Sequence, residues 1–173
     1  NNTTITALWT INEYTITFNT DGGTEVSSIT QDYNSTITLP DDPVKEGYTF
    51  GGWFTDTTLT VSFSATTMPA ENFTVYAKWN ALLKVIFETN GGNELETVFV
   101  EPNTTIQAPE GVTKEGHTLE GWYTSVNGGE TLDERWSFIN NSVTNDLILY
   151  AKWTINQYTI TFDTYGGNDI ESI

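Results

Sequence analysis

The amino-acid sequence predicts a mostly β chain, α+β at most, made of tandem small repeats built from antiparallel hairpins with little helix. The first observation is an internal repeat. Gly-Tyr-Thr-Phe-Gly-Gly-Trp at residues 47–53 returns as Gly-His-Thr-Leu-Glu-Gly-Trp at residues 116–122, about 70 residues later. The second is that apolar residues alternate with threonine in short runs such as residues 14–18, which is typical of a half-buried strand. Apolar residues nowhere recur at helical spacing over three turns, so helix is expected to be minor.

A second signature marks the end of each repeat. Tyr-Ala-Lys-Trp occurs at residues 76–79 and again at 150–153, and residues 4–9 follow the same alternation up to a final tryptophan. In a chain of 173 residues this period favours two small domains over one larger domain. The pattern predicts four parts: the closing strand of a preceding repeat at 1–12, repeat 1 at 13–80, repeat 2 at 81–153, and the opening hairpin of a truncated repeat at 154–173.

Each repeat is expected to open with a hairpin. In repeat 1 the alternating strand at residues 14–18 leads into Asn-Thr-Asp-Gly-Gly at 19–23, and a weaker return strand follows at 25–29. Gly22 and Gly23 supply the positive-φ residues that a tight hairpin turn requires. The same order returns at residues 85–98, where the turn glycines are Gly91 and Gly92 and the return strand is expected at 94–98, and again at residues 158–173.

The middle of each repeat is predicted to be extended and irregular. Short extended pieces at residues 36–40 and 104–109 are stopped by proline, and the glycine-rich aromatic stretch follows each of them. Repeat 2 is longer than repeat 1 between this stretch and its closing signature. The additional residues include Val-Asn-Gly-Gly-Glu at 126–130, which indicates an added hairpin tip.

Tryptophans are the expected core anchors. Four of them recur at matching positions of the two repeats: Trp53, Trp79, Trp122 and Trp153. The chain has no cysteine, so we expect these rings to be buried and to take the place that a disulfide has in other small domains. Trp136 has no tryptophan counterpart in repeat 1 and is the best candidate for a solvent-facing ring that contacts a ligand such as a glycan.

Charge and hydropathy exclude two classes of partner. The net charge of −17, with only six basic residues, repels phosphate backbones, so the sequence predicts no nucleic-acid binding. No run of 18 or more apolar residues occurs, so no membrane span is predicted in this segment. An acidic chain rich in Thr and Asn suits a surface exposed outside a cell.

No catalytic, cofactor or metal site is predicted. The single histidine, His117, stands where the other repeat has Tyr48, and we interpret it as a half-buried ring in an aromatic slot. Acidic pairs that resemble glycosidase carboxylates by type occur at 41–42 (Asp41 and Asp42), 94–96 (Glu94 and Glu96) and 133–134 (Asp133 and Glu134). No pair recurs in both repeats, so these acids are interpreted as solvated faces. Neither an EF-hand loop nor a histidine cluster is present, and weak calcium binding by surface carboxylates is the open alternative.

Taken in order, these signatures resemble the Listeria–Bacteroides repeat, the internalin B-repeat type. The resemblance covers nearly the whole chain. It implies a small β-grasp-like fold with the first and last strands of a repeat side by side, and tandem arrays in large secreted or wall-anchored proteins. The departures are Leu8 in place of lysine in the first tryptophan signature, residues 82–84 in place of the usual Tyr-Thr strand entry, and His117 in place of tyrosine.

The sequence therefore predicts a non-enzymatic spacer or stalk of an extracellular cell-surface protein or filament, whose partners are the neighbouring repeats. The alternative is an adhesin-type module that binds a host protein or a glycan. Residues 1–9 and 158–173 are expected to be unpaired edges. Either they are the frayed ends of a longer array, or they join chains head to tail.

Overall fold

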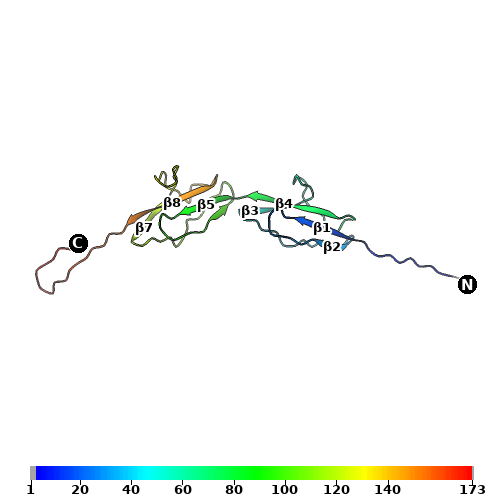
Figure 1. The fold of residues 1–173 in the computed structure, drawn as a ribbon, viewed down its shortest axis with the longest axis horizontal. Coiled ribbons are helices and arrows are strands. Elements are labelled where there is room, and N and C mark those ends of the chain that lie inside the picture. Colours follow the sequence, from blue (N-terminus) through cyan, green and yellow to red (C-terminus); the bar gives the residue numbers. More distant parts are fainter. Residues whose placement is uncertain (1–2, 173) are drawn as a thin grey trace. The chain divides into compact units, whose positions relative to one another are not determined.

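The computed structural model describes residues 3–172, and the chain divides into two compact units, Asn1–Leu82 and Leu83–Ile173. Each unit contains one four-stranded sheet (Figure 1). Residues 3–172 contain no helix, and hence none that could cross a membrane. The expectation of a mostly β chain with tandem small sheets is confirmed.

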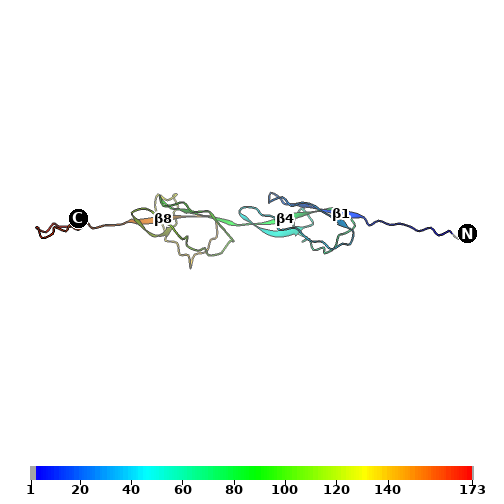
Figure 2. The same ribbon diagram turned by 90° about the horizontal axis from the view of Figure 1, so that it is seen from below.

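In unit 1 the sheet has the strand order β2-β1-β4-β3. The strands are β1 (Glu13–Asn19), β2 (Ile29–Asp32), β3 (Tyr48–Phe54) and β4 (Phe73–Ala81). β1 and β4 are parallel, whereas the two outer pairs are antiparallel. The first and last strands of the unit therefore lie side by side, as the resemblance implied, and both views show them as neighbours (Figure 1, Figure 2).

Unit 2 repeats this topology in the order β6-β5-β8-β7. Its strands are β5 (Leu83–Glu88), β6 (Val98–Val100), β7 (His117–Tyr123) and β8 (Leu147–Ile155). β5 and β8 form the central parallel pair. The arrangement is that of a β-grasp sheet in which the connection between the second and third strands is a loop within the described residues.

The core of each unit follows the period of two that the sequence shows. In unit 1, Ile16 and Phe18 of β1 face Val75 and Ala77 of β4, and all four side chains are buried. Burying one such aliphatic side chain stabilises a fold by about 1.5–3 kcal/mol. The equivalent residues of unit 2 are Val85, Phe87, Leu149 and Ala151, and Ile106, Trp122 and Val143 complete that core.

A β-bulge in the third strand of each unit explains the glycine-rich aromatic stretch. The pairing of β3 with β4 shifts register between Phe50 and Trp53, and Gly52 has φ of 102°. In a regular strand, residues three apart point to opposite faces. The bulge instead turns both aromatic rings to the core, with centroids 5.2 Å apart. β7 shows the same shift between Leu119 and Gly121.

The expected return strands at 25–29 and 94–98 are wrong in position. The structure places β2 at Ile29–Asp32 and β6 at Val98–Val100. The residues before them bond elsewhere: the Thr24 N–H donates to the Val44 carbonyl and the Val44 N–H to Thr24 Oγ1, each at 2.9 Å. In unit 2 Asn93 and Thr113 make the matching contacts. The turn therefore opens into a loop that crosses to the segment before the third strand.

The irregular middle segments contribute less strand than expected. The extended pieces at 36–40 and 104–109 form only the single bridges Thr36↔Thr67 and Thr104↔Val143. The additional residues of repeat 2 do form a hairpin-like loop, bridged at its base by Tyr123↔Arg135. A Cβ on Gly129 of this loop would lie 2.6 Å from the Tyr150 ring, so the loop lies on that ring. This contact explains why Tyr150 is buried while its counterpart Tyr76 is only half-buried.

The segments at both ends form no strand within the described residues. Ile5, Leu8 and Trp9 are about nine-tenths exposed. After Ile155 the Asn156 N–H donates to the Gly116 carbonyl at 2.8 Å, and residues 157–172 form no strand. Asn1, Asn2 and Ile173 lie outside the described residues. In units 1 and 2 a closing strand lies between the first and third strands, so residues 3–12 would need two neighbouring strands from another repeat. Their assignment as a closing strand stays a prediction.

Candidate functional site

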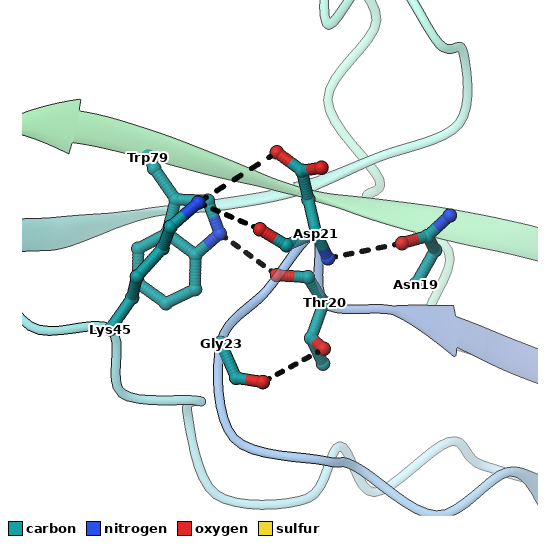
Figure 3. Close-up of polar contacts among 6 residues, drawn as sticks. All are labelled: Asn19, Thr20, Asp21, Gly23, Lys45 and Trp79. Atoms are coloured by element: carbon teal, nitrogen blue, oxygen red, sulfur yellow. Dashed lines mark hydrogen bonds and ion pairs between the residues drawn. The ribbon is translucent and has the colours of Figure 1, made fainter.

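The same side-chain contact ties the opening turn to the closing strand in both units. The Trp79 indole Nε1 donates to the Thr20 carbonyl at 2.9 Å, and Trp153 Nε1 donates to the Thr89 carbonyl at 2.7 Å. We call this arrangement the turn–tryptophan clasp. It consists of Thr20, Gly23, Lys45 and Trp79 in unit 1 (Figure 3) and of Thr89, Gly92, Lys114 and Trp153 in unit 2.

The turn of the clasp is held by local hydrogen bonds. Asp21 and Gly22 have positive φ of 45° and 84°. The Gly23 N–H donates to the Thr20 carbonyl at 3.0 Å, and Thr20 Oγ1 donates back to the Gly23 carbonyl at 3.2 Å. Asn19 Oδ1 accepts from the Asp21 N–H, so a side chain also caps the turn (Figure 3). The expected positive φ of the first turn glycine is confirmed, because Gly22 and its equivalent Gly91 have φ of 84° and 86°.

The second turn glycine has a different role from the one predicted. A Cβ on Gly23 would lie 2.5 Å from Cζ2 of Trp79, closer than any real contact allows, and its φ is not positive. A Cβ on Gly92 would lie 2.8 Å from the Thr113 carbonyl oxygen and 2.9 Å from Cζ2 of Trp153. The two glycines of each turn therefore have different roles. The first adopts the positive φ of the turn, and the second, which has no side chain, leaves space for the tryptophan ring.

A lysine completes each clasp. Lys45 Nζ donates to the Asp21 carbonyl at 2.7 Å and lies 5.7 Å from the Trp79 ring centroid (Figure 3). Lys114 Nζ donates to the Asn90 carbonyl at 2.7 Å, and it lies 5.9 Å from the Trp153 ring. Sequence reasoning missed both lysines. The tripeptide Lys-Glu-Gly recurs at 45–47 and 114–116, and that recurrence was the available signal.

The four expected tryptophan anchors fall into two classes. Trp53 and Trp122 are 5% and 3% exposed and belong to the cores. Trp79 and Trp153 are only half-buried, so the expectation of full burial is wrong for them. Their rings pack against the margin of each core and lie over the turns, where the indole nitrogen donates to a carbonyl and a lysine lies near the ring.

Trp136 is not the solvent-facing ring that was predicted. It is half-buried and packs against the core of unit 2. Its counterpart in unit 1 is Phe63, because the Trp136 N–H donates to the Trp122 carbonyl as the Phe63 N–H donates to the Trp53 carbonyl, both at 2.8 Å. Trp136 does line a cleft of about 460 Å³. The other lining residues include Pro109, Trp122 and Arg135.

The comparisons with known proteins agree with the geometry. The model of the Listeria-Bacteroides repeat domain matches residues 14–78 and 84–152. The chain belongs to this family. Each matched span of the Listeria-Bacteroides repeat contains the turn and the lysine of the clasp and stops one residue before its tryptophan.

Curated proteins of two bacteria are similar to this chain. Two proteins of Evansella cellulosilytica, provisionally named as a membrane protein and a Gly-rich membrane protein, are 42% and 39% identical, each over 98% of this chain. Internalin H of Listeria monocytogenes is 34% identical over 83% of this chain. The aligned region is 25%, 19% and 25% of these proteins, so the chain spans a quarter or less of each relative's length.

The residues considered for catalysis and metal binding in these Listeria-Bacteroides repeats are dispersed. All six acids of the candidate pairs, at 41–42, 94–96 and 133–134, are exposed. His117 is half-buried, and its Nδ1 lies 2.7 Å from the Glu115 carbonyl oxygen. Among residues 3–172 no group of three or more His, Cys, Asp or Glu side chains is placed to hold a metal ion.

One carboxylate organises the loop after β3 in the first Listeria-Bacteroides repeat, and sequence reasoning missed it. Asp56 accepts hydrogen bonds from the Thr58 hydroxyl, from the N–H and hydroxyl of Thr60, and from the Val61 N–H at 2.7 Å. These bonds, the one from Thr58 first, hold the pKa of Asp56 well below its usual range. The side chain stabilises the loop as an Asx-type cap.

The second Listeria-Bacteroides repeat carries an ion pair on its bulge. Glu120 stands where repeat 1 has Gly51, and Lys152 Nζ donates to Glu120 Oε1 at 2.8 Å. This contact lowers the pKa of Glu120 and raises the pKa of Lys152. Both side chains are exposed, so the pair has a small effect on stability.

Proposed function

We propose that this chain is a non-enzymatic spacer of an extracellular cell-surface protein, in which neighbouring repeats are its partners. The membership of the Listeria-Bacteroides repeat family and the similarity to Internalin H support a surface-protein repeat. The membrane-protein names of the two Evansella relatives point to the same location. A spacer needs repeated, independently folded units, and the chain has two units of one topology.

The observation that carries this proposal is the contrast between what the two units share and where they differ. They share the residues of the fold and the clasp: Thr20/Thr89, Gly22/Gly91, Gly23/Gly92, Lys45/Lys114, Trp53/Trp122, Ala77/Ala151 and Trp79/Trp153. They differ in the exposed loop after the third strand. In unit 1 this loop is capped by a single aspartate, Asp56, whereas in unit 2 it is a longer hairpin-like loop. If both units bound the same ligand through this loop, the exposed residues of the loop would match between the units.

The charge of the chain fits the same role. The net charge of −17 keeps copies of such a protein apart and soluble at a crowded surface. This repulsion is not specific to any partner, which suits a spacer better than a receptor.

A display experiment tests the spacer role. One, two or three copies of the whole chain are placed between a cell-wall anchor and a reporter epitope, and the access of antibody to the epitope is measured on living cells. A spacer gives access that rises with copy number and is unchanged when exposed loop residues are exchanged between the units. Access that does not depend on copy number would rule the spacer role out.

The cleft beside Trp136 favours a second candidate, an adhesin-type module for a glycan or host protein. Arg135 lines the same cleft and donates to the Glu120 carbonyl at 2.9 Å. Unit 1 provides the matched variants, because it has Ser62 and Phe63 at these positions. A glycan array probed with the wild type and with an Arg135→Ser, Trp136→Phe variant separates the two functions. Binding that only the wild type shows favours the module at this cleft, and no binding by the wild type favours the spacer. Equal binding by both proteins would exclude this cleft as the binding site.

Head-to-tail joining of chains is the remaining partner proposal. The turn at residues 164–167 has the hydrogen bonds of the clasp turn, with the Gly167 N–H donating to the Thr164 carbonyl at 3.0 Å, and Trp9 corresponds in sequence to the clasp tryptophan. Such a joint would lack a third strand, which flanks the closing strand in both units. Light scattering on the chain with and without residues 158–173 tests it. A monomer in both samples rules out joining, and a concentration-dependent mass lost on deletion establishes it.

A further inference from the structure

We propose that each unit is a mechanical clamp that resists tension applied through its two chain ends. Such a clamp would allow the chain to bear load as well as to set a distance, which goes beyond the proposed spacer role. The clamp follows from the strand order and from three side-chain contacts that both units share, so it holds for each unit by itself.

The central parallel pair is placed to be loaded lengthwise. β1 and β4 run in the same direction (Figure 1). In their register Ile16 lies opposite Phe73 and Asn19 opposite Tyr76. The chain enters the unit at the start of β1 and leaves it at the end of β4. Tension on these two points therefore pulls the neighbouring strands in opposite directions along their length, which is shear.

Shear is the strong direction for this pair. The bonds between parallel strands are evenly spaced along the ladder, so a lengthwise load falls on all of them together. A load that peels the strands apart meets them one after another. Unfolding under force is governed by the barrier to unfolding, and that barrier is higher when the bonds must break at the same time. β5 and β8 give unit 2 the same arrangement, with Val85 opposite Leu147 and Glu88 opposite Tyr150.

In both units a side chain adds a hydrogen bond to the central parallel pair, at the end where its two strands begin. Asn72 Oδ1, just before β4, accepts from the Thr15 N–H of β1 at 2.8 Å. In unit 2 Asp146 Oδ1 accepts from the Lys84 N–H at 2.9 Å. Each of these bonds joins the two strands that tension would slide, so each adds to the load-bearing row.

The turn–tryptophan clasp fastens the other end of the pair. Trp79 lies in β4 beyond Tyr76, the last residue of β4 that pairs with β1, and its indole donates to the carbonyl of Thr20, which directly follows β1. Sliding of the strands must break this bond. It must also separate the Trp79 ring from Gly23, against which the ring lies so closely that a Cβ there would be 2.5 Å from Cζ2. Lys45 adds a third attachment by its bond to the Asp21 carbonyl.

The direction of pulling provides the decisive test, because the chain has no cysteine that would interfere with handles. A Glu13→Cys, Ala81→Cys variant of the whole chain places handles at the start of β1 and the end of β4. A Glu13→Cys, Glu71→Cys variant places them at the two strand starts. All three positions are exposed, and unit 2 lies outside the handles in both variants. Chemical denaturation checks that the two variants are equally stable without force.

In optical tweezers the first variant loads the pair in shear and the second peels it. We expect unfolding forces that are higher in shear, with separate distributions. Equal forces in the two geometries would overturn the clamp while leaving the spacer role intact, because a spacer that bears no load needs no such asymmetry. A failed display experiment would likewise leave the clamp untouched.

A clasp variant then tests the fastening at the far end. Trp79→Phe removes the indole donor, and the lifetime of unit 1 under constant shear should fall roughly fivefold, which corresponds to about 1 kcal/mol for one hydrogen bond. In the peeling geometry, which begins at the opposite end of the pair, the loss should be smaller. Trp153→Phe lies outside the handles and serves as the matched control with no expected change. An equal loss in both geometries would show that Trp79 stabilises the unit without bearing load.

Discussion

The indole nitrogen of Trp79 lies 2.9 Å from the carbonyl oxygen of Thr20, a residue 59 positions earlier in the chain. This bond joins the last strand of the unit to the turn that follows its first strand. The equivalent bond from Trp153 to Thr89 spans 64 positions at 2.7 Å. Each of these contacts joins the two ends of a unit that contains no disulfide. Because closing so long a loop costs entropy, the bond forms only when the repeat between its ends is folded.

Gly23→Ala should destabilise unit 1 through the tryptophan ring rather than through the backbone. The new Cβ would meet Cζ2 of Trp79 at 2.5 Å, so the ring must move and its bond to Thr20 weakens. The expected cost is about 1–3 kcal/mol, the range for overpacking, measured by denaturant unfolding. In a Trp79→Phe background the alanine should cost clearly less, because the clashing atom is gone. Equal costs in the two backgrounds would contradict the steric role of Gly23.

Gly91→Val should destabilise unit 2 through backbone strain alone. Gly91 has φ of 86°, and the nearest atoms to a Cβ there are at ordinary contact distance, 3.6 Å or more. The expected cost is about 1–3 kcal/mol. Gly91→Asn is the control, since asparagine tolerates positive φ far better and Asn90 beside it already has φ of 50°. A valine variant as stable as the asparagine variant would show that the turn does not require this conformation.

The two classes of tryptophan should differ in stability cost. Trp122 is 3% exposed inside the core, and Trp122→Ala should cost about 3–5 kcal/mol. Trp153 is half-buried, so Trp153→Ala should cost less, although it also leaves the Thr89 carbonyl without its indole donor. Urea unfolding of the two variants measures the difference. A larger loss for Trp153→Ala would mean that the clasp, and not the core, dominates the stability of unit 2.

The cap at Asp56 should be sensitive to acid. Its pKa in the folded chain lies below the usual aspartate value of about 3.9, so its stabilising effect is fully present above that value. The effect is lost as the pH falls below it through the folded pKa. An NMR titration of the Asp56 carboxyl should show a midpoint below the usual value, and Thr58→Ala should raise it. A midpoint at the ordinary value that does not respond to Thr58→Ala would exclude the cap.

The tandem architecture could be predicted because the alternation of apolar residues and the turn sequences indicated the same repeat. Alternation at residues 14–18 and at 85–87 placed the opening strands, and the Gly-Gly turns followed directly. The return strands could not be placed, because Thr24 and Asn93 bond to residues 20 positions away and open each turn into a loop. A pattern read along the chain contains no information about such a partner.

The candidate site was predicted in part for a similar reason. The recurrence of tryptophans identified the rings, but only the fold shows that Trp79 and Trp153 are half-buried and lie over the turns at the margin of each core. Trp136 was misjudged because its counterpart, Phe63, follows a loop of different length, which hid the match. Lys45 was missed because a lysine is usually a solvated residue, and here it caps a turn.

Hydrogen exchange at the indole nitrogens tests the turn–tryptophan clasp directly. In a proton–nitrogen NMR spectrum the indole N–H signals of Trp79 and Trp153 should exchange slowly with solvent, because each donates to a carbonyl within the fold. Trp9 is 87% exposed and provides the fast reference in the same sample. Single Trp→Phe variants assign the signals. Slow exchange at both positions is the predicted result, and exchange at Trp79 and Trp153 as fast as at Trp9 would contradict the clasp.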